Sequence, residues 1–377
     1  MTVSTRSTTH QIWLFLAVRQ VVHNQFIFLC HRDLRAKLAR RYNYLKRRLF
    51  RQGARNLMPF PIHDKLVIAV ASSALFDLRE SDAVYREKGT EAYRRRQRDN
   101  EHKILNPGVA FPFIRRLLKL NSSHDPNDQP VEVILLSRND PDTGLRVFNT
   151  IEHYGLDISR GAFLSGGSPH RYINAFCASL FLSANQADVE EAIRNGYPAG
   201  RVLGDASVDD PQDTELRVAF DFDGVLADDE AECVYQEEKL AGFNEAERSR
   251  ARFPHNPGPL KKLFNQIAAI QRQRRKAQSA EAEQTRIRTA IITSRSAPAH
   301  ERVITTLREW DIEVDETFFL GGIDKNRILE VFKPHVYFDD QLVYTEPAQG
   351  VIPSVHVPYG VVNKKPKSGA IQAPPHR

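Results

Sequence analysis

The chain has 377 residues, enough for one large domain or two, and its 41% hydrophobic content is enough for a packed core. Its cysteines, Cys30, Cys177 and Cys233, are odd in number and widely spaced, which argues against a disulfide framework or a zinc site and favours a reducing compartment. The net charge of +6 is unevenly distributed, because residues 1–57 carry 12 Lys and Arg against one acid, Asp33. The rest of the chain carries 41 Lys and Arg against 46 Asp and Glu and is mildly acidic.

Residues 1–57 are interpreted as a basic N-terminal extension whose role stays open. Arg19 ends the apolar run Gln11–Val18, so this run is far shorter than the roughly 20 residues of a membrane-spanning helix. No small-residue cleavage site follows it, so the run is a poor signal peptide. The Arg-rich stretch Arg32–Arg55 suits contacts with nucleic acid or anionic lipid. Met58 is the second of two methionines, so a start at Met58 is an alternative in which this extension is never made.

After Met58, short apolar runs alternate with amphipathic helical patterns, which predicts an α/β fold with a Rossmann-like parallel sheet. The first strand is expected over Leu66–Ala71 and the central strand of the second half over Val218–Phe220. The second half is then expected to continue with strands at Thr289–Ile292 and Val336–Phe338 and helices at Glu301–Glu309 and Asn326–Phe332.

Two carboxylates follow the strand at Val218–Phe220. Asp221 and Asp223 are two residues apart and lead into a turn at Gly224, so both side chains are expected to point the same way from the strand end. Parallel α/β sheets build their active sites at such ends. One carboxylate in this position can act as a nucleophile and the other as an acid and base, and together they attract Mg²⁺.

Three further groups follow in an order that suits the same site. Thr293 and Ser294 come directly after a predicted strand, Lys325 begins a predicted helix, and Asp339 and Asp340 end the last predicted strand. The hydroxyls and the lysine are suited to neutralising phosphate oxygens, and the acid pair is suited to completing a metal site. This order of four motifs is typical of the haloacid dehalogenase-like phosphohydrolases.

Five stretches narrow the resemblance. They are Ser72–Leu78, Ala219–Glu232, Gly258–Lys261, Pro334–Gln341 and His356–Gly360. Together they resemble the cytosolic class I 5′-nucleotidases, and the similarity runs from about Lys65 to Val362. The first motif reads Asp-Phe-Asp-Gly-Val here and Asp-Gly-Asp-Ala-Val in animal members of the family, so the spacing of the two carboxylates is kept.

The resemblance implies Mg²⁺-dependent hydrolysis of nucleoside 5′-monophosphates, of the AMP and IMP type, through an aspartyl-phosphate. It implies that Asp221 is the nucleophile and that Asp223 is the acid and base. Thr293 and Lys325 are then expected to bind the phosphoryl oxygens, with Ser294 as a weaker candidate. The metal is expected on Asp221, on Asp339 and on the backbone carbonyl of Asp223, with Asp340 as a water-mediated or supporting ligand.

The sequence also predicts an internal duplication. Leu66–Phe76 aligns with Leu216–Leu226 at an offset of 150, which places Ala71 against Asp221 and Ser73 against Asp223. Later landmarks recur at offsets of 155 to 157, and one of them is the pair Gly166-Gly167, which aligns with Gly321-Gly322. Another is Leu182–Gln186, which aligns with the segment that contains the acid pair, so Ala184 and Asn185 are expected to replace the two acids. Periods this long indicate duplicated domains.

The first copy lacks every expected catalytic carboxylate, so it is predicted to hold neither Mg²⁺ nor a phosphoenzyme. Its hydroxyls, one arginine and the glycine turn suit binding of a phosphate or a ribose. The residues proposed for that role are Ser72, Ser73, Arg138, Gly166 and Gly167. A purely structural role for this copy, in which it only covers the face of its partner, is the slightly favoured alternative.

The expected organisation is a degenerate lobe over 58–210, a catalytic lobe over 211–362 and a disordered tail over 363–377. The excursion of about 60 residues after the first motif is too long for an ordinary connection, which predicts a helical cap at about 227–288.

A cytoplasmic phosphatase with no nucleic-acid or membrane partner is the favoured interpretation. A nucleotide activator and an oligomer are left open. Two alternatives also stay open, namely a phosphatase of the same mechanism that acts on another small phosphate ester, and a nucleic-acid or membrane-associated protein that binds through its basic extension.

Overall fold

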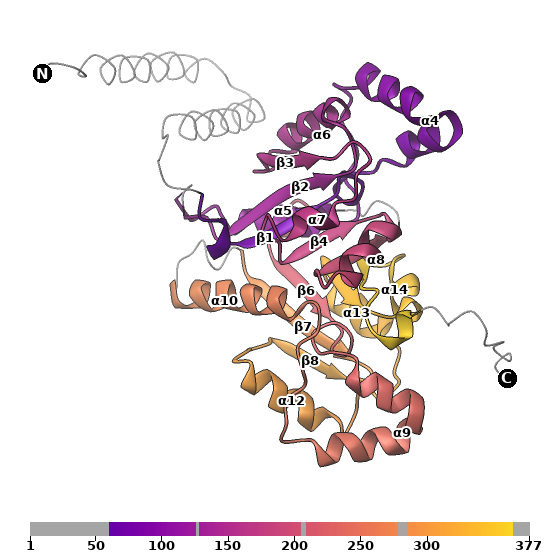
Figure 1. Ribbon diagram of the computed structural model, residues 1–377. Helices are drawn as coiled ribbons and strands as arrows, with labels where there is room; N and C mark the ends of the chain where they lie inside the picture. Colours follow the sequence, from indigo (N-terminus) through magenta and orange to yellow (C-terminus); the bar gives the residue numbers. More distant parts are fainter. Residues whose placement is uncertain (1–59, 126–127, 205–208, 278–284, 365–377) are drawn as a thin grey trace, which may run out of the picture. The chain divides into compact units, whose positions relative to one another are not determined.

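The computed structural model describes residues 60–125, 128–204, 209–277 and 285–364 of the chain (Figure 1). Predictions for the extension 1–57 and for the tail beyond Lys364 lie outside the described residues. The tail was predicted to begin at Asn363, but this residue closes a short turn and donates hydrogen bonds to the carbonyls of Asp340 (2.8 Å) and Tyr359 (2.7 Å). The folded part therefore includes Asn363. Within the described ranges, no helix is both long and apolar enough to cross a bilayer.

Ten strands form one sheet in the order β3-β2-β1-β4-β5-β10-β9-β6-β7-β8. Every neighbouring pair is parallel except β5 and β10, which run antiparallel in the middle of the sheet. The prediction of a mostly parallel α/β fold is therefore confirmed. The strands are β1 (Leu66–Val70), β2 (Val131–Ser137), β3 (Arg160–Phe163), β4 (Leu180–Ser183), β5 (Ala199–Leu203), β6 (Leu216–Phe220), β7 (Ile287–Thr293), β8 (Glu316–Phe319), β9 (Val336–Asp339) and β10 (Ser354–His356).

The strand order repeats within the chain. The first five strands lie in the order β3-β2-β1-β4-β5, and the second five, read from the other edge of the sheet, lie in the matching order β8-β7-β6-β9-β10. Each half has its first strand in the middle, as a doubly wound unit does. The antiparallel contact pairs Ser354 with Leu203 and His356 with Arg201, so β5 and β10 join the two halves into one sheet. We refer to these halves as the first and second repeats.

The repeat offset is 150 at the first strand and 156 at the next three. The sequence-based alignment of Ala184 and Asn185 with Asp339 and Asp340 is therefore one residue out of register. Ser183, at the end of β4, is the counterpart of Asp339, and its Oγ accepts a hydrogen bond from the amide two residues later, as Asp339 Oδ1 does. Ala184 is then the counterpart of Asp340, which corrects the assignment of Ala184 and Asn185 to the acid pair. The reason is that Asn185 is the N-cap of the following helix.

Helices connect successive strands. They are α3 (Ser72–Leu75), α4 (Arg79–Asp99), α5 (Phe111–Lys119), α6 (Pro141–Tyr154), α7 (His170–Ile173), α8 (Gln186–Arg194), α9 (Glu230–Ser249), α10 (Lys261–Ala277), α12 (His300–Glu309), α13 (Asn326–Phe332) and α14 (Leu342–Ala348). Local sequence sets several of their ends. The side chain of Asp140, for example, caps α6 by accepting the amide hydrogen of Thr143 at 2.8 Å, and Gly155 ends the helix in the left-handed conformation.

Two hairpins of helix, α4 and α9, project from opposite ends of the row of strands in Figure 1. Each is broken by one residue with positive φ, Gly89 (φ 77°) in α4 and Lys239 (φ 59°) in α9, and these positions lie 150 residues apart. An edge-to-face aromatic pair follows the same offset, because the Tyr85–Tyr93 and Tyr235–Phe243 ring centroids are both 6.0 Å apart. The hairpin is therefore part of both repeats.

The segment 227–288, predicted as a cap, divides into two parts. Only α9 projects as a hairpin. The second part, α10, packs on the sheet through buried Leu263, Phe264 and Ile267, and the ring of Phe264 lies 4.9 Å from that of Phe220 on β6. The helical prediction for this segment is right, but α10 belongs to the core because its apolar face is covered.

Candidate active site

The carboxyl ends of three adjacent strands form the site. Strand β6 lies between β7 and β9, so the residues that follow these strands meet at one edge of the sheet. Asp221 comes directly after β6, and its amide donates to the carbonyl of Phe338 on β9 at 2.8 Å. The next turn contains Gly224 (φ 70°), where a Cβ atom would lie 2.4 Å from Oδ2 of Asp340. Glycine at this position thus permits both the turn and the close approach of the acid.

Lys325 joins two of the acids. Its Nζ lies 3.0 Å from Oδ1 of Asp221 and 2.7 Å from Oδ2 of Asp339, and all three side chains are buried. The hydroxyl of Tyr337 also donates to Oδ2 of Asp339. Burial raises the pKa of Asp221 to about 7, although the charge of Lys325 opposes that change. Burial lowers the pKa of Lys325, but the two carboxylates more than compensate, so it lies above its usual value and the ammonium stays charged.

The acids form a compact cluster. Oxygens of Asp221, Asp339 and Asp340 all lie within 4.8 Å of one another, and the three residues are buried. Burial and the neighbouring charges of Asp339 and Asp221 raise the pKa of Asp340 to about 10. Oδ1 of Asp340 is buried without a hydrogen-bond partner among the described residues. Three carboxylates, one of which has a buried oxygen without a partner, fit a divalent cation such as Mg²⁺, because Mg²⁺ prefers oxygen ligands.

The two predicted hydroxyls differ in position. Thr293 is the last residue of β7 and is buried, and its Oγ1 accepts from the amide of Arg295 at 3.2 Å. Ser294 is exposed and donates to the hydroxyl of Tyr344 at 3.2 Å. Tyr344 also reaches Lys325, whose Nζ lies 4.3 Å from the centre of its ring. The structure thus brings Thr293 and Lys325 to the strand ends, with Ser294 at the rim beside a tyrosine that the sequence did not identify.

Asp223 has a partner that the sequence did not reveal. Arg295 donates from Nε and Nη2 to the two oxygens of Asp223, both at 2.7 Å, which is the fork-to-carboxylate geometry typical of arginine. In the sequence, Arg295 stands out only because it directly follows Thr293-Ser294. This position does not indicate a contact with Asp223, which is 72 residues away.

In the first repeat, two of the five residues predicted to bind a nucleotide, Arg138 and Gly166, contact each other. Ser72 Oγ lies 2.9 Å from Ser137 Oγ and accepts from Asn139 at 3.1 Å. Arg138 donates from Nε to Asp188 at 2.7 Å and from Nη1 to the carbonyl of Gly166 at 3.0 Å. A carboxylate therefore already neutralises the arginine that was expected to bind phosphate.

The predicted glycine turn is partly kept. Gly166 (φ 93°) matches Gly322 (φ 94°), and Ser165 (φ 48°) matches Gly321 (φ 56°). This register makes Gly167 the counterpart of Ile323, one residue away from the alignment made on sequence. Among the described residues, neither Ser73 nor Gly167 hydrogen-bonds to the other residues predicted for this site. The group thus has the turn, but its one arginine is already paired with Asp188.

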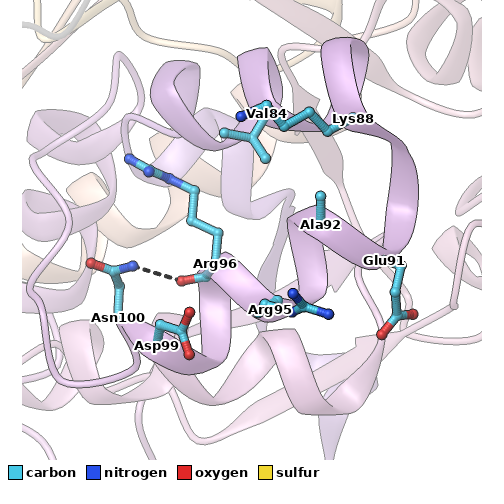
Figure 2. A pocket seen from close by; sticks show the side chains of 8 residues that line it. All are labelled: Val84, Lys88, Glu91, Ala92, Arg95, Arg96, Asp99 and Asn100. Carbon is cyan, nitrogen blue, oxygen red and sulfur yellow. Dashed lines mark hydrogen bonds between the residues drawn. The ribbon is translucent and has the colours of Figure 1, made fainter.

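A hollow of about 470 Å³ lies on α4 of the first repeat (Figure 2). Its lining side chains are charged or small, and Figure 2 shows Arg95 and Arg96 on one arm of the hairpin with Lys88 on the other. None of the predicted catalytic or nucleotide-binding residues lines it. Arg96 is moreover paired with Glu80 at 2.8 Å. The hollow is therefore separate from the strand-end cluster.

Comparisons with known proteins agree with this geometry. The 5′-nucleotidase family model matches residues 58–364. The chain is 36% identical over 300 residues to cytosolic 5′-nucleotidase 1B from Homo sapiens, a match that covers 77% of this chain and 48% of that protein. The chain thus spans about half the length of the curated relative it matches. No solved structure matches significantly. The resemblance inferred from the motifs is confirmed, and the chain belongs to the cytosolic class I 5′-nucleotidase family.

Proposed function

We propose that the protein is a 5′-nucleotidase that hydrolyses nucleoside 5′-monophosphates, of the AMP and IMP type, through a phosphoenzyme on Asp221. The observation that carries this proposal is the buried cluster in which Lys325 contacts both Asp221 and Asp339 at the ends of β6 and β9. Family membership and the name of the human relative support the substrate class. The strand order of each repeat supports a fold of the haloacid dehalogenase type.

Asp221 is the proposed nucleophile. In this role its carboxylate attacks phosphorus, and the bond between phosphorus and the 5′ oxygen breaks. Asp223 gives a proton to the departing ribose oxygen and later takes one from the water that hydrolyses the aspartyl-phosphate. Lys325 and Thr293 stabilise the charge on the transferring phosphoryl oxygens, with Ser294 at the rim of the same site.

Mg²⁺ is the proposed cofactor, held by Asp221, Asp339 and Asp340 together with the backbone of Asp223. When bound, it supplies positive charge that offsets the repulsion between the carboxylates and the phosphate. The buried oxygen of Asp340 that lacks a hydrogen-bond partner supports this assignment. Lys325 neutralises only part of a cluster of three acids, which is a second argument for a cation.

The test is phosphate release from a panel of nucleoside 5′-monophosphates, sugar phosphates and an aryl phosphate, each with Mg²⁺ and with a chelator. The proposal predicts a preference for nucleoside monophosphates and loss of turnover in the chelator. A preference for a sugar phosphate would retain the mechanism but replace the substrate class. Full activity in the chelator would contradict the metal assignment.

A further inference from the structure

A layer of buried charge stands behind Asp223. Arg295, whose side chain is 2% exposed, holds Asp223 with two hydrogen bonds, whereas the side chain of Asp223 is 21% exposed. On its far side, Nη1 of Arg295 donates to Glu247, and Nη2 lies 3.2 Å from Nε2 of His255. Asp223 is therefore held from within the protein by Arg295, while about a fifth of its side chain stays exposed.

Glu247 connects this layer to the hairpin α9. It lies in the last turns of α9, and its two oxygens contact Arg295 and Arg302, the latter at 2.9 Å. His255 lies 3.3 Å from the same carboxylate. Arg302 makes a second contact with α9 through Glu230 at 3.0 Å. The orientation of Asp223 thus depends on where α9 lies.

The first repeat offers an internal comparison, because it has the same framework without the nucleophile. Arg146 donates to the carbonyl of Lys103 at 2.9 Å, as Arg302 donates to that of Phe253 at 3.0 Å. The hydroxyls of Thr150 and Thr306 bond the carbonyls of these two arginines in the same way. Arg146 and Arg302 are therefore equivalent, and this part of the framework is retained in both repeats.

The charged layer is not retained. The equivalent positions of the first repeat hold Ser73 for Asp223, Asn139 for Arg295, Gln97 for Glu247 and Leu105 for His255. Gln97 still accepts from Arg146 at 3.0 Å, as Glu247 accepts from Arg302, so only the charge has changed at this position. Four members of the layer have thus lost their charge or ionisable group in the repeat that has also lost the nucleophile.

We infer that Arg295, supported by Glu247 and His255, is a positioning residue that orients Asp223 for proton transfer and makes that orientation depend on the hairpin α9. This inference rests on the proposed function. The framework arginines serve both repeats and are structural, whereas the charged layer serves only the repeat that carries Asp221. The two hydrogen bonds from Arg295 fix the plane of the Asp223 carboxylate. Proton transfer to the leaving oxygen requires the carboxylate to be oriented in this way.

The test compares two leaving groups in the variant Arg295→Gln. The ribose alkoxide of a nucleotide needs a proton in order to depart, whereas an aryl oxide needs much less help. We expect the rate of leaving-group release in a single turnover, which excludes the later hydrolysis of the phosphoenzyme, to fall about a hundredfold with AMP and less than about tenfold with an aryl phosphate. Equal losses with the two substrates would overturn the inference, because a general structural defect affects both equally.

Arg146→Gln is the matched control. Arg146 is buried and is the equivalent of Arg302, but it lies in the first repeat, where it donates to Gln97 and to the carbonyl of Lys103 and not to the charged layer. Its variant should change the two substrates by equal factors, and a leaving-group effect as large as that of Arg295→Gln would also contradict the inference. If Arg295→Gln does not fold, the nearly isosteric Glu247→Gln allows the same comparison. The inference then predicts a larger loss of rate with AMP than with the aryl phosphate, and equal losses would contradict it.

The two hypotheses fail in different ways. If wild-type protein released no phosphate from any nucleoside monophosphate, the proposed function would be wrong. If wild-type protein released it but Arg295→Gln treated alkyl and aryl leaving groups alike, only the positioning role would be wrong. Melting curves of each variant separate a loss of folded protein from a loss of rate.

Discussion

At the scale of single residues, the central feature is a charge balance around Lys325. The ammonium is 1% exposed and lies between Asp221 and Asp339, with Asp340 beside them. Buried charges are tolerated only when they are paired, and a pair that loses one member leaves the other uncompensated. We therefore propose two roles for Lys325, namely stabilising the folded cluster and binding phosphate.

Replacing Lys325 with Met should reveal both roles. We expect the free energy of unfolding to fall by about 3–5 kcal/mol without Mg²⁺, since two buried carboxylates lose their shared cation. We also expect phosphate release to disappear. Denaturant unfolding and a phosphate assay measure the two effects. Lys262→Met on the exposed surface of α10 is the control and should change neither. A fully stable Lys325→Met protein would show that the cluster does not need this charge.

At the scale of elements, the turn after β6 determines where the acids meet. Gly224 is in the left-handed region and leaves no room for a Cβ atom next to Asp340. Gly89, in the hairpin α4, has a similar φ of 77° but no atom within 4 Å of a Cβ atom at that position. These two glycines therefore separate the cost of backbone strain from the cost of a steric clash.

Gly89→Ala should cost about 1–3 kcal/mol of stability, because its backbone (φ 77°, ψ −175°) lies in a region that is nearly restricted to glycine. Gly224→Ala should cost more than Gly89→Ala, and it should also lower kcat, because the new methyl group displaces the carboxylate of Asp340. Thermal unfolding and phosphate release measure the two effects. Equal stability losses for the two variants, with full activity in Gly224→Ala, would contradict the assigned close approach.

At the scale of the whole described part, two similar repeats share one sheet, and the chain between them is held by charged residues. Asp213, in the segment from β5 to β6, accepts from Arg217 at 2.6 Å and contacts His335 at 3.2 Å. Arg116 of the first repeat lies 3.9 Å from the same carboxylate. Burial and then the charges of Arg116 and Arg217 lower the pKa of His335 to about 3, although Asp213 opposes them.

This junction should make stability depend on pH. Between about pH 3 and 6.5 the unfolded chain binds a proton at His335 that the folded chain does not, so stability falls as the pH falls through this window. The contribution of this group is at most about 1.4 kcal/mol per pH unit. His335→Asn should lose less stability than wild type between pH 7 and 4.5 in denaturant unfolding. His102→Gln, at an exposed site, should behave as wild type does. Identical pH dependence in wild type and His335→Asn would contradict the assignment.

The sequence was most informative for residues whose position depends only on the strand or helix next to them. The carboxylates after β6, the hydroxyl that ends β7 and the acids that end β9 all follow apolar runs, and parallel strands bring such ends together. Lys325 followed from its place before α13. These residues could therefore be assigned to one site without knowledge of the overall structure.

Features that depend on distant segments were not predicted. Arg295 and Glu247 are 48 residues apart and meet only because the last turns of α9 contact the loop that follows β7. The antiparallel contact of β5 with β10 has no local pattern, since it depends on how the two repeats meet. The one-residue error that placed Ala184 instead of Ser183 against Asp339 matches the error at the glycine turn. There Ser165 stands for Gly321, so matching the two double glycines shifts the register by one residue.

The central claim is that Asp221 carries the phosphoryl group, and the most direct measurement is to trap that group. The variant Asp223→Asn, given a radiolabelled aryl phosphate, should form the phosphoenzyme and hydrolyse it slowly, because the leaving group needs little protonation but water still needs a base. After acid quench and digestion, the account predicts label on the peptide that contains Asp221. Asp221→Asn should carry no label and retain less than about one thousandth of wild-type turnover. Label on another residue, or turnover that survives in Asp221→Asn, would contradict the account.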